Sequence, residues 1–355
     1  MPFVEVSLNE RSSFSPRSAL VVQSELAHDV ASFVVGSGVL PSSVPDGLPV
    51  SLQWGDDTGA LQEFVGYVHH VEPLFSDAQP LGRFKCVCIG ASWALMSGLQ
   101  RSWQHQSLDT IVREVATEAF LSADVEAHSV LWPYIAANCA AWEFLLGLAA
   151  KINYTLAVNG TEVRFLSTDE VLRRSMPSAP RITTRSFRPV VGAATEIGRK
   201  SRRLGYGIDP RSGRMFSAIQ GPAGAFVELD TEMTATTPEE AAAQVAARSP
   251  FVYRADAEAA GNARIRQASV VYVADVAFEY AGHWYVQQVE HDVSESNYAC
   301  YFQLGKNARG AFAESKTQGF GVRVRTDPFG EVTGNPPPSI LTNGVWRSSW
   351  ARRAS

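Results

Sequence analysis

Two stretches far apart in the chain share one pattern: GYVHHVEP at 66–73 and WYVQQVEHD at 284–292. Each contains Tyr-Val, two polar residues and Val-Glu. A strand and a turn precede each motif. An aromatic strand with cysteine follows it, RFKCVCIG at 83–90 and NYACYFQLG at 297–305. Because the order of the elements repeats as well as the motif, we interpret the two regions as copies of one small antiparallel β-module.

The paired histidines of the first motif raise the question of a metal site. Successive side chains of a regular strand point to opposite faces, so His69 and His70 are not expected to bind one ion together. The second motif has Gln287 and Gln288 at these positions. A polar exterior or an interface explains both pairs, whereas metal binding explains only one. We therefore predict no metal site here.

Composition places the chain among globular proteins. It has 355 residues, of which 45% are hydrophobic and 19% charged, enough for several domains with substantial cores. The net charge of −5 argues against a protein that coats nucleic acid. We expect no secretory signal and no membrane-spanning segment, since no apolar run reaches about 18 residues. The 4 cysteines are expected to be buried free thiols of a reducing cytoplasm.

Residues 1–100 are predicted to form a first small β-barrel. Short runs rich in Val, Phe and Tyr are separated by Gly, Pro, Asp and Ser, which is typical of antiparallel barrels and sandwiches. The predicted strands are 18–24, 49–54, 63–73 and 83–90.

Residues 101–180 are predicted to form an α/β insertion. Helical spacing of apolar residues follows Ser107, a plausible N-cap, and a second helix is expected at about 139–151 with Asn138 as its cap. The dipeptide Asn159-Gly160 between alternating runs predicts a β-hairpin over 154–167.

Residues 181–315 are predicted to form the second barrel, with an inserted helix near 238–248 and a strand meander over 268–280, 283–293 and 297–307. Residues 316–355 are read as an extended arm, stiffened by three consecutive prolines. Aromatic and arginine side chains are typical anchors of interfaces, so the arm is expected to bind a partner. The candidate interface residues are Trp346, Arg347, Trp350, Arg352 and Arg353.

The order of these elements resembles phage tail hub proteins. That family includes baseplate hubs of contractile phages, late-control D proteins and the hub part of type VI secretion spikes. The family's insertion carries a phrase like W-x-F-L-x-x-L-A-x-x-x-x-Y, and the second barrel ends in a Tyr-x-Val-x-x-Val-x-His strand, from which the spacing here departs slightly. The matching residues are Trp142, Phe144, Leu145, Leu148, Ala149, Tyr154, Tyr285, Val286, Val289 and His291.

The resemblance implies a structural, non-enzymatic hub of a tail tip or baseplate. Three copies with two barrels each would form a pseudo-sixfold ring between a hexameric tail tube and a threefold spike or fibre. The implied partners are a tail tube or distal tail ring protein, the tape-measure protein and the central spike or fibre. DNA would pass through the lumen without specific binding. The protein would be assembled in the host bacterial cytoplasm and reside in the virion.

Two other functions stay open at this stage. A tail-associated hydrolase of cell wall or glycan would have its site within 181–265, although the sequence predicts no catalytic, cofactor or metal residue. Gly90-Ala91-Ser92-Trp93-Ala94 approaches the G-x-S-x-G pattern of hydrolases but ends in alanine, and we interpret it as a turn with a tryptophan that anchors the insertion. The chain could also be the hub of a bacterial contractile injection system.

Overall fold

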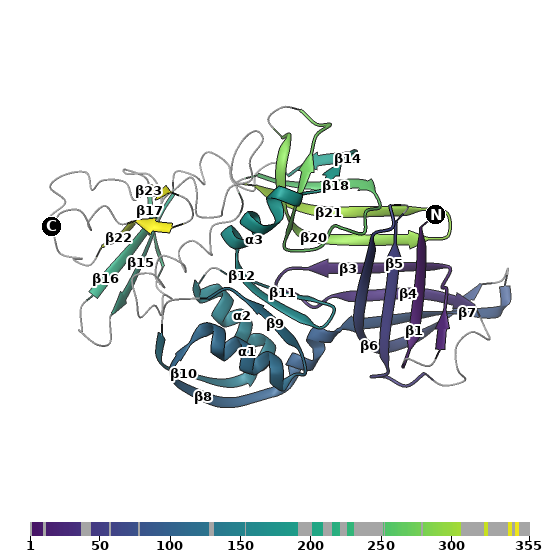
Figure 1. The fold of residues 1–355 in the computed structure, drawn as a ribbon, viewed down its shortest axis with the longest axis horizontal. Coiled ribbons are helices and arrows are strands. Elements are labelled where there is room, and N and C mark those ends of the chain that lie inside the picture. The colour runs from purple at the N-terminus through teal and green to yellow at the C-terminus, as the bar shows by residue number, and fades with distance from the viewer. Residues whose placement is uncertain are drawn as a thin grey trace.

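The computed structural model describes residues 2–190, apart from 10–11, 37–43, 57, 77–78, 128–130 and 153, and residues 251–306, apart from 252 and 278–279. It also describes six further strands: β15 (Ser201–Ile208), β16 (Met215–Gln220), β17 (Phe226–Asp230), β22 (Arg323–Arg325), β23 (Ile340–Thr342) and β24 (Val345–Arg347). The helix expected near 238–248 lies outside the described residues. The chain is mainly β, as predicted (Figure 1).

The duplication predicted from the two motifs is confirmed by the strand topology. The first module contains β3 (Ser18–Ser24), β4 (Val30–Gly36), β5 (Pro49–Gly55), β6 (Leu61–Ser76) and β7 (Gln79–Gly90). The second contains β14 (Thr184–Pro189), β18 (Tyr253–Ala260), β19 (Ser269–Val273), β20 (Gly282–Ser294) and β21 (Tyr298–Lys306). Both modules have one pairing order, β3-β4-β7-β6-β5 and β14-β18-β21-β20-β19, with every pair antiparallel.

Both modules also carry a β-bulge at the same place in the motif. The register shifts between Val68 and His70 in β6, and between Val286 and Gln288 in β20. A bulge interrupts the alternation of side chains between the two faces of a sheet. The expectation that His69 and His70 point apart was therefore wrong, because their ring centroids lie 5.1 Å from each other.

The two modules are joined into one sheet by pairing of β20 with β3. The result is a 13-stranded sheet rather than two closed barrels, because the path through the described strands ends at β14 and β2 without returning on itself. Figure 1 shows its strands stacked from β14 through β20 and β3 to β7. The remaining members are β1 (Phe3–Leu8) and β2 (Ser12–Phe14), which extend β5, and β13 (Arg181–Ile182), which pairs with β19.

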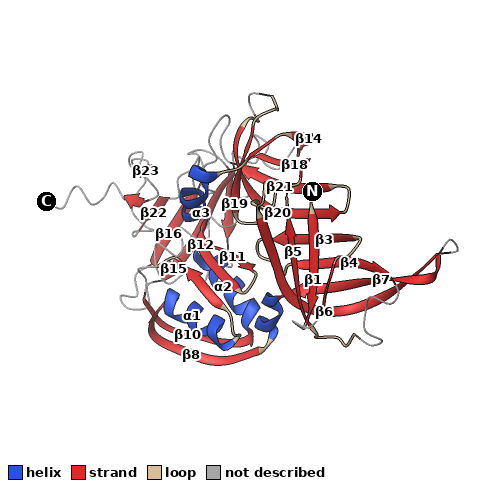
Figure 2. Cartoon of the chain, turned by 45° about the vertical axis from the view of Figure 1, so that its right-hand side comes forward, coloured by secondary structure: helices blue, strands red, loops and turns tan. Residues whose placement is uncertain are grey.

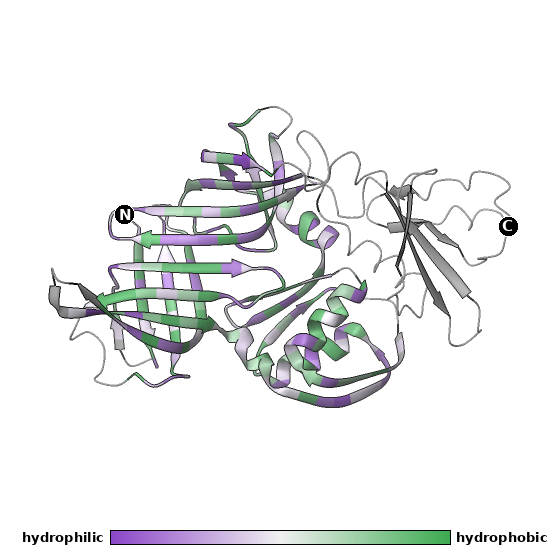
Figure 3. Ribbon diagram, turned by 180° about the vertical axis from the view of Figure 1, so that it is seen from behind, coloured by the Kyte–Doolittle hydropathy of each residue, from purple (hydrophilic) through white to green (hydrophobic). Residues whose placement is uncertain are grey.

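Strands β1 and β5 run across the stack, and the space between them and the other strands is filled by one hydrophobic core shared by both modules. The strand predicted at 49–54 is present as β5, and Val50, Leu52 and Trp54 on its inner face are buried. Figure 3 shows an alternation of hydrophobic and hydrophilic residues along the strands of the sheet. As expected, Cys86 and Cys88 share a buried face, and burial raises the pKa of both thiols.

The insertion between β7 and β13 contains all the helices of the part of the chain that the structure describes (Figure 2). Its elements are η1 (Ala91–Met96), β8 (Gly98–Ser107), α1 (Leu108–Glu118), β9 (Ser122–Val125), β10 (Leu131–Ala140), α2 (Ala141–Ile152), β11 (Tyr154–Asn159), β12 (Glu162–Ser167), α3 (Thr168–Ser175) and η2 (Met176–Ser178). Among the described residues, no helix has the length and apolarity needed to span a membrane.

The two helices and the hairpin predicted for the insertion are present. Helix α1 begins after Ser107, and Gly160 has the positive φ of 56° that the turn between β11 and β12 requires. The start of the second helix was predicted too early. Asn138 is not its cap but pairs with Gln100 in the ladder of β10 and β8, two strands that lack a clear alternating pattern and were missed.

Candidate functional site

The pairing of β3 with β20, here called the internal junction, holds the two modules together. It runs antiparallel from Ser24 opposite Gln288 to Ser18 opposite Ser294. The ladder continues beyond the strands, where the Glu25 backbone N–H donates to the Gln287 carbonyl at 3.0 Å. Backbone hydrogen bonds therefore make one module continue the sheet of the other.

A buried carboxylate reinforces the internal junction and ties in the insertion. Glu25 is only 8% exposed, and its Oε2 accepts hydrogen bonds from the Tyr285 hydroxyl at 2.6 Å and the Thr155 hydroxyl at 3.1 Å. The next residue continues this link, since the Leu26 backbone N–H donates to the Leu156 carbonyl at 2.8 Å. One loop between β3 and β4 thus fixes the second module and the insertion relative to the first module.

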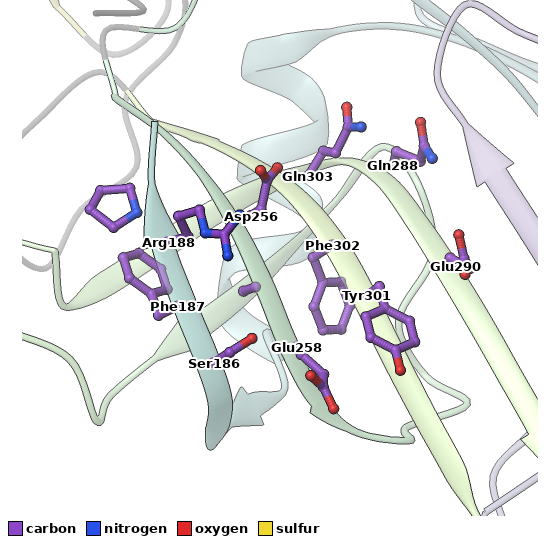
Figure 4. A pocket seen from close by; sticks show the side chains of 12 residues that line it. Ser186, Phe187, Arg188, Asp256, Glu258, Gln288, Glu290, Tyr301, Phe302 and Gln303 are labelled. Carbon is purple, nitrogen blue, oxygen red and sulfur yellow. The ribbon is translucent and has the colours of Figure 1, made fainter. Parts of the chain in front are cut away.

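The outward face of the second module is acidic. One row of paired residues runs across it, with Glu258 of β18 beside Tyr301 of β21 and Tyr301 beside Glu290 of β20. Figure 4 shows the three side chains in sequence across the strands, with Asp256 and Gln303 in the next row. Asp292 extends the cluster along β20. We call this surface, with Asp256, Glu258, Glu290 and Asp292, the acidic face.

The pKa shifts of residues on the acidic face agree with this clustering of carboxylates. Partial desolvation and the neighbouring Asp292 carboxylate raise the pKa of Glu290. Desolvation and then the carboxylates of Glu258, Asp292 and Glu290 raise the pKa of Tyr301. An open hollow of about 510 Å³ lies over the same strands. The acidic face is therefore concave and rich in carboxylates, and two guanidinium groups of β14 lie at its edge, that of Arg188 and that of Arg185, which is 3.8 Å from the Glu258 carboxylate.

The corresponding face of the first module has different chemistry. The shared pairing pattern makes Val34, Lys85 and Glu72 the counterparts of Glu258, Tyr301 and Glu290. Apolar and oppositely charged side chains thus replace the carboxylate row. Sequence reasoning gave only the net charge of the chain, whereas the strand register brings the four carboxylates of the acidic face together.

The G-x-S-x-G-like stretch forms a serine–histidine contact but not an accessible nucleophile. The hydroxyl of Ser92, in η1, lies 2.8 Å from Nδ1 of His28, and Ser92 is only 1% exposed. The neighbouring Asp29 carboxylate accepts from the Ser24 backbone N–H and from the Gln267 side chain. Trp93 is 44% exposed, so it does not anchor the insertion as expected. A substrate would have to displace packed protein atoms to reach the Ser92 oxygen.

Among the described residues, no group of three or more His, Cys, Asp or Glu side chains is placed to hold a metal ion. His70 instead lies with Nε2 2.8 Å from the Glu72 carboxylate on an exposed stretch of β6.

The predicted interface residues of the arm are only partly placed. Trp346 and Arg347 lie in β24, which pairs with β23 in a short antiparallel hairpin, so the backbone at Trp346 is a strand and not a helix. Trp350, Arg352 and Arg353 lie outside the described residues. The partner-binding role of all five stays a prediction.

Comparison with solved structures finds the same fold in tail proteins. The 43 kDa tail protein of prophage MuSo2 from Shewanella oneidensis aligns with a TM-score of 0.62 at 11% identity, over 86% of this chain and 98% of that one. A tail protein from Neisseria meningitidis MC58 gives 0.66 at 10% identity, over 87% and 98%. An E. coli component of the type VI secretion system gives 0.53 at 8% identity, over 88% and 79%. No family model and no curated protein sequence matches.

The chain therefore has the fold of phage tail proteins and of a type VI secretion component. The resemblance noted in the sequence is confirmed at the level of the fold, along nearly the whole length of the two tail proteins. At identities of about a tenth, the shared feature is the arrangement of the strands rather than any set of conserved side chains.

Proposed function

We propose that the protein is a structural hub of a bacteriophage tail tip or baseplate. The observation that carries this proposal is the duplicated module joined edge to edge through β3 and β20, which leaves β14 and residues 70–76 of β6 without a second neighbour among the described strands. Three copies joined in the same way would form a ring of six modules. Such a ring meets a sixfold tube on one side and a threefold spike or fibre on the other.

The acidic face is proposed to line the channel of this ring. The opposite face of the sheet is covered by the shared core, so the acidic face is the one open to solvent. Phosphate capture requires clustered Lys and Arg, and here carboxylates outnumber them. DNA would therefore slide through without being held.

The remaining assignments rest on this function. The neighbours are a tail tube or distal tail ring protein, the tape-measure protein and a central spike or fibre. The arm at 316–355 docks on one of them through Trp346 and the residues around it. The protein resides in the virion after assembly in the host cytoplasm. A bacterial contractile injection system is the second candidate, because the fold also matches the type VI secretion component.

Copy number in purified particles tests the proposal. Quantitative mass spectrometry of particles from the strain that carries the gene should give three copies per particle, counted against a component present in six copies. A number not divisible by three would overturn the ring. Particles of phage tail composition favour the first candidate, and sheath-and-spike particles without a capsid favour the second.

Two variants refine the assignment. Deleting 333–355 should leave the purified chain folded and reduce its incorporation into particles, and unchanged incorporation would remove the docking role of the arm.

Ser92→Ala should leave infection intact. A loss of cell-wall hydrolysis on Ser92→Ala would instead identify an enzyme.

A further inference from the structure

Two edges of the sheet, β14 and residues 70–76 of β6, are counterparts of the two strands that meet in the internal junction, and we call them the free edges. Residues 61–67 of β6 pair with β5, but residues 70–76 pair only with β7 among the described strands. The equivalent half of β20 pairs with β3. Likewise, among the described strands β14 pairs only with β18, whereas its counterpart β3 pairs with β4 and also with β20. Each edge therefore lacks the neighbour that its counterpart has.

The pairing pattern aligns the edges with the junction residue by residue. In the shared motif, His70 of the first module is equivalent to Gln288 of the second. Pro73 is therefore equivalent to His291, and Leu74 to Asp292. The pairing of β14 with β18 and of β3 with β4 makes Ser186 equivalent to Ser18. Arg188 is therefore equivalent to Leu20, and Pro189 to Val21. The internal junction thus serves as a template for the contact that the free edges would make.

Burial shows that both edges lack a cover. Val289 and His291 are fully buried in the second module, whereas Val71 is half-buried and Pro73 exposed in the first. On the other edge, Ala19 and Val21 are 2% and 1% exposed, but their counterparts Phe187 and Pro189 are only half-buried. The apolar side chains of each edge are in place, and none of the described strands completes their burial.

The prolines sit where they alter the hydrogen bonding of such a contact. In an antiparallel pair, the N–H and C=O groups of every second residue point to the same neighbour. Because Glu25 donates to Gln287, the odd-numbered residues of β3 and β20 face each other, and Val21 with His291 is a hydrogen-bonded pair. Their counterparts are Pro189 and Pro73, which have no N–H to donate.

We propose that β14 of one copy pairs antiparallel with residues 70–76 of β6 in the next copy, in the register of the internal junction. Val190 then lies opposite Glu72, Arg188 opposite Leu74, and Ser186 opposite Ser76. This inference rests on the proposed ring and names its interface. The two prolines meet at one hydrogen-bonded site and remove both of its bonds, so the contact is weak and forms where other tail proteins hold the copies together.

Charge and edge chemistry fit the same register. Arg188 becomes the diagonal neighbour of Glu72 on the outer face, where opposite charges attract across strands. Proline on an edge strand with its missing N–H directed outward is a known protection against uncontrolled pairing of sheets. A head-to-tail contact either closes into a ring or grows into a filament, so a protein that is made in many copies benefits from a weak contact.

Engineered cysteines test the register directly. Leu74→Cys with Arg188→Cys puts the two thiols at a pair without mutual hydrogen bonds, where Cα atoms lie about 4.5 Å apart, within the range of a disulfide. The matched control is Leu20→Cys with Asp292→Cys, the same pair of the internal junction. In assembled particles, mild oxidation should link the first pair between copies, up to covalent trimers, and the control pair only within one chain.

Replacing the prolines tests their role. The purified double variant Pro73→Val, Pro189→Val should self-associate at least about tenfold more tightly than the unchanged chain, because two backbone hydrogen bonds are restored. The control Pro45→Val changes an exposed proline that belongs to neither of the two edges. Light scattering over a range of concentrations should show a mass of three chains for the double variant, with circular dichroism confirming that all variants fold.

The outcomes separate this inference from the ring itself. Three copies per particle with Leu74→Cys and Arg188→Cys unlinked, while the control pair oxidises, would overturn the edge contact and leave the hub in place. Equal masses for the double proline variant and the unchanged chain at every concentration would also overturn it. Disulfide-linked products larger than trimers would refute closure of the ring. A particle without three copies would instead refute the proposed function.

Discussion

Acid should destabilise the fold through one histidine at the contact between the modules. His291 is fully buried beneath Trp54, with ring centroids 5.2 Å apart. A chain of hydrogen bonds reaches it, because Trp54 Nε1–H donates to the Tyr298 oxygen at 3.1 Å and the Tyr298 hydroxyl lies 2.9 Å from His291 Nδ1. Because burial lowers the pKa of His291, the imidazole is neutral near pH 7, and its protonation would place a charge in the core.

The size of the effect follows from the pKa. Burial lowers the pKa of His291 from 6.5 to about 3. Between these values the unfolded chain binds a proton that the native chain does not, so the free energy of unfolding falls as the pH falls. The contribution is fully present above pH 6.5 and is lost progressively toward pH 3. At pH 5, about 1.5 units below the unfolded pKa, the loss is about 2 kcal/mol at about 1.4 kcal/mol per unit.

Urea unfolding at pH 7.5 and pH 5.0 measures this contribution. His291→Gln and His291→Asn both remove the titrating group, so each variant should lose about 2 kcal/mol less stability than the unchanged chain between the two pH values. The quantity compared is the change in the free energy of unfolding between the two pH values. The effect of each substitution on packing is the same at both pH values and therefore cancels. Equal losses in the unchanged chain and in both variants would refute a buried neutral imidazole at this site.

Two substitutions probe the packing and the junction by the same unfolding assay. Gly305→Ala would place a Cβ 2.3 Å from a ring atom of Phe251 and should cost about 1–3 kcal/mol, whereas Gly98→Ala meets open space and should change stability by less than about 0.5 kcal/mol. A similar result for both glycines would contradict the packing. Glu25→Ala removes the acceptor of the Tyr285 hydroxyl and should cost about 1–3 kcal/mol, and Glu25→Gln, which keeps an acceptor, should cost less.

The sequence predicted those parts of the fold that local patterns encode. The motif at 66–73 and its copy at 284–292 predicted the duplication, since alternation of side chains and turn residues suffices to place a strand. The same held for α1, with its helical spacing, and for the turn at Asn159-Gly160. Strand β8 was missed because its side chains are exposed along most of its length. Strand β10 was missed because its residue types, LWPYIAANCA, do not alternate between polar and apolar although every second side chain over 134–138 is exposed.

The candidate site was less accessible to sequence reasoning. Its acidic residues lie on strands far apart in the chain, and only the register brings Glu258 beside Tyr301 and Glu290. The bulge at His69 was likewise hidden, because a bulge depends on the partner strand and not on the motif itself. The contact between Ser92 and His28 joins residues 64 positions apart, and its burial decides that it is structural.

By itself, then, the sequence determined that one β-module occurs twice, separated by a helical insertion. The reason is that the periodicity of side chains is a local property of each segment. The tertiary structure alone decided that β3 and β20 join the copies into one sheet and that, among the described strands, β14 and part of β6 have no second neighbour. Strands pair through backbone groups, which every residue has. The pattern of side chains therefore does not predict which edges will pair.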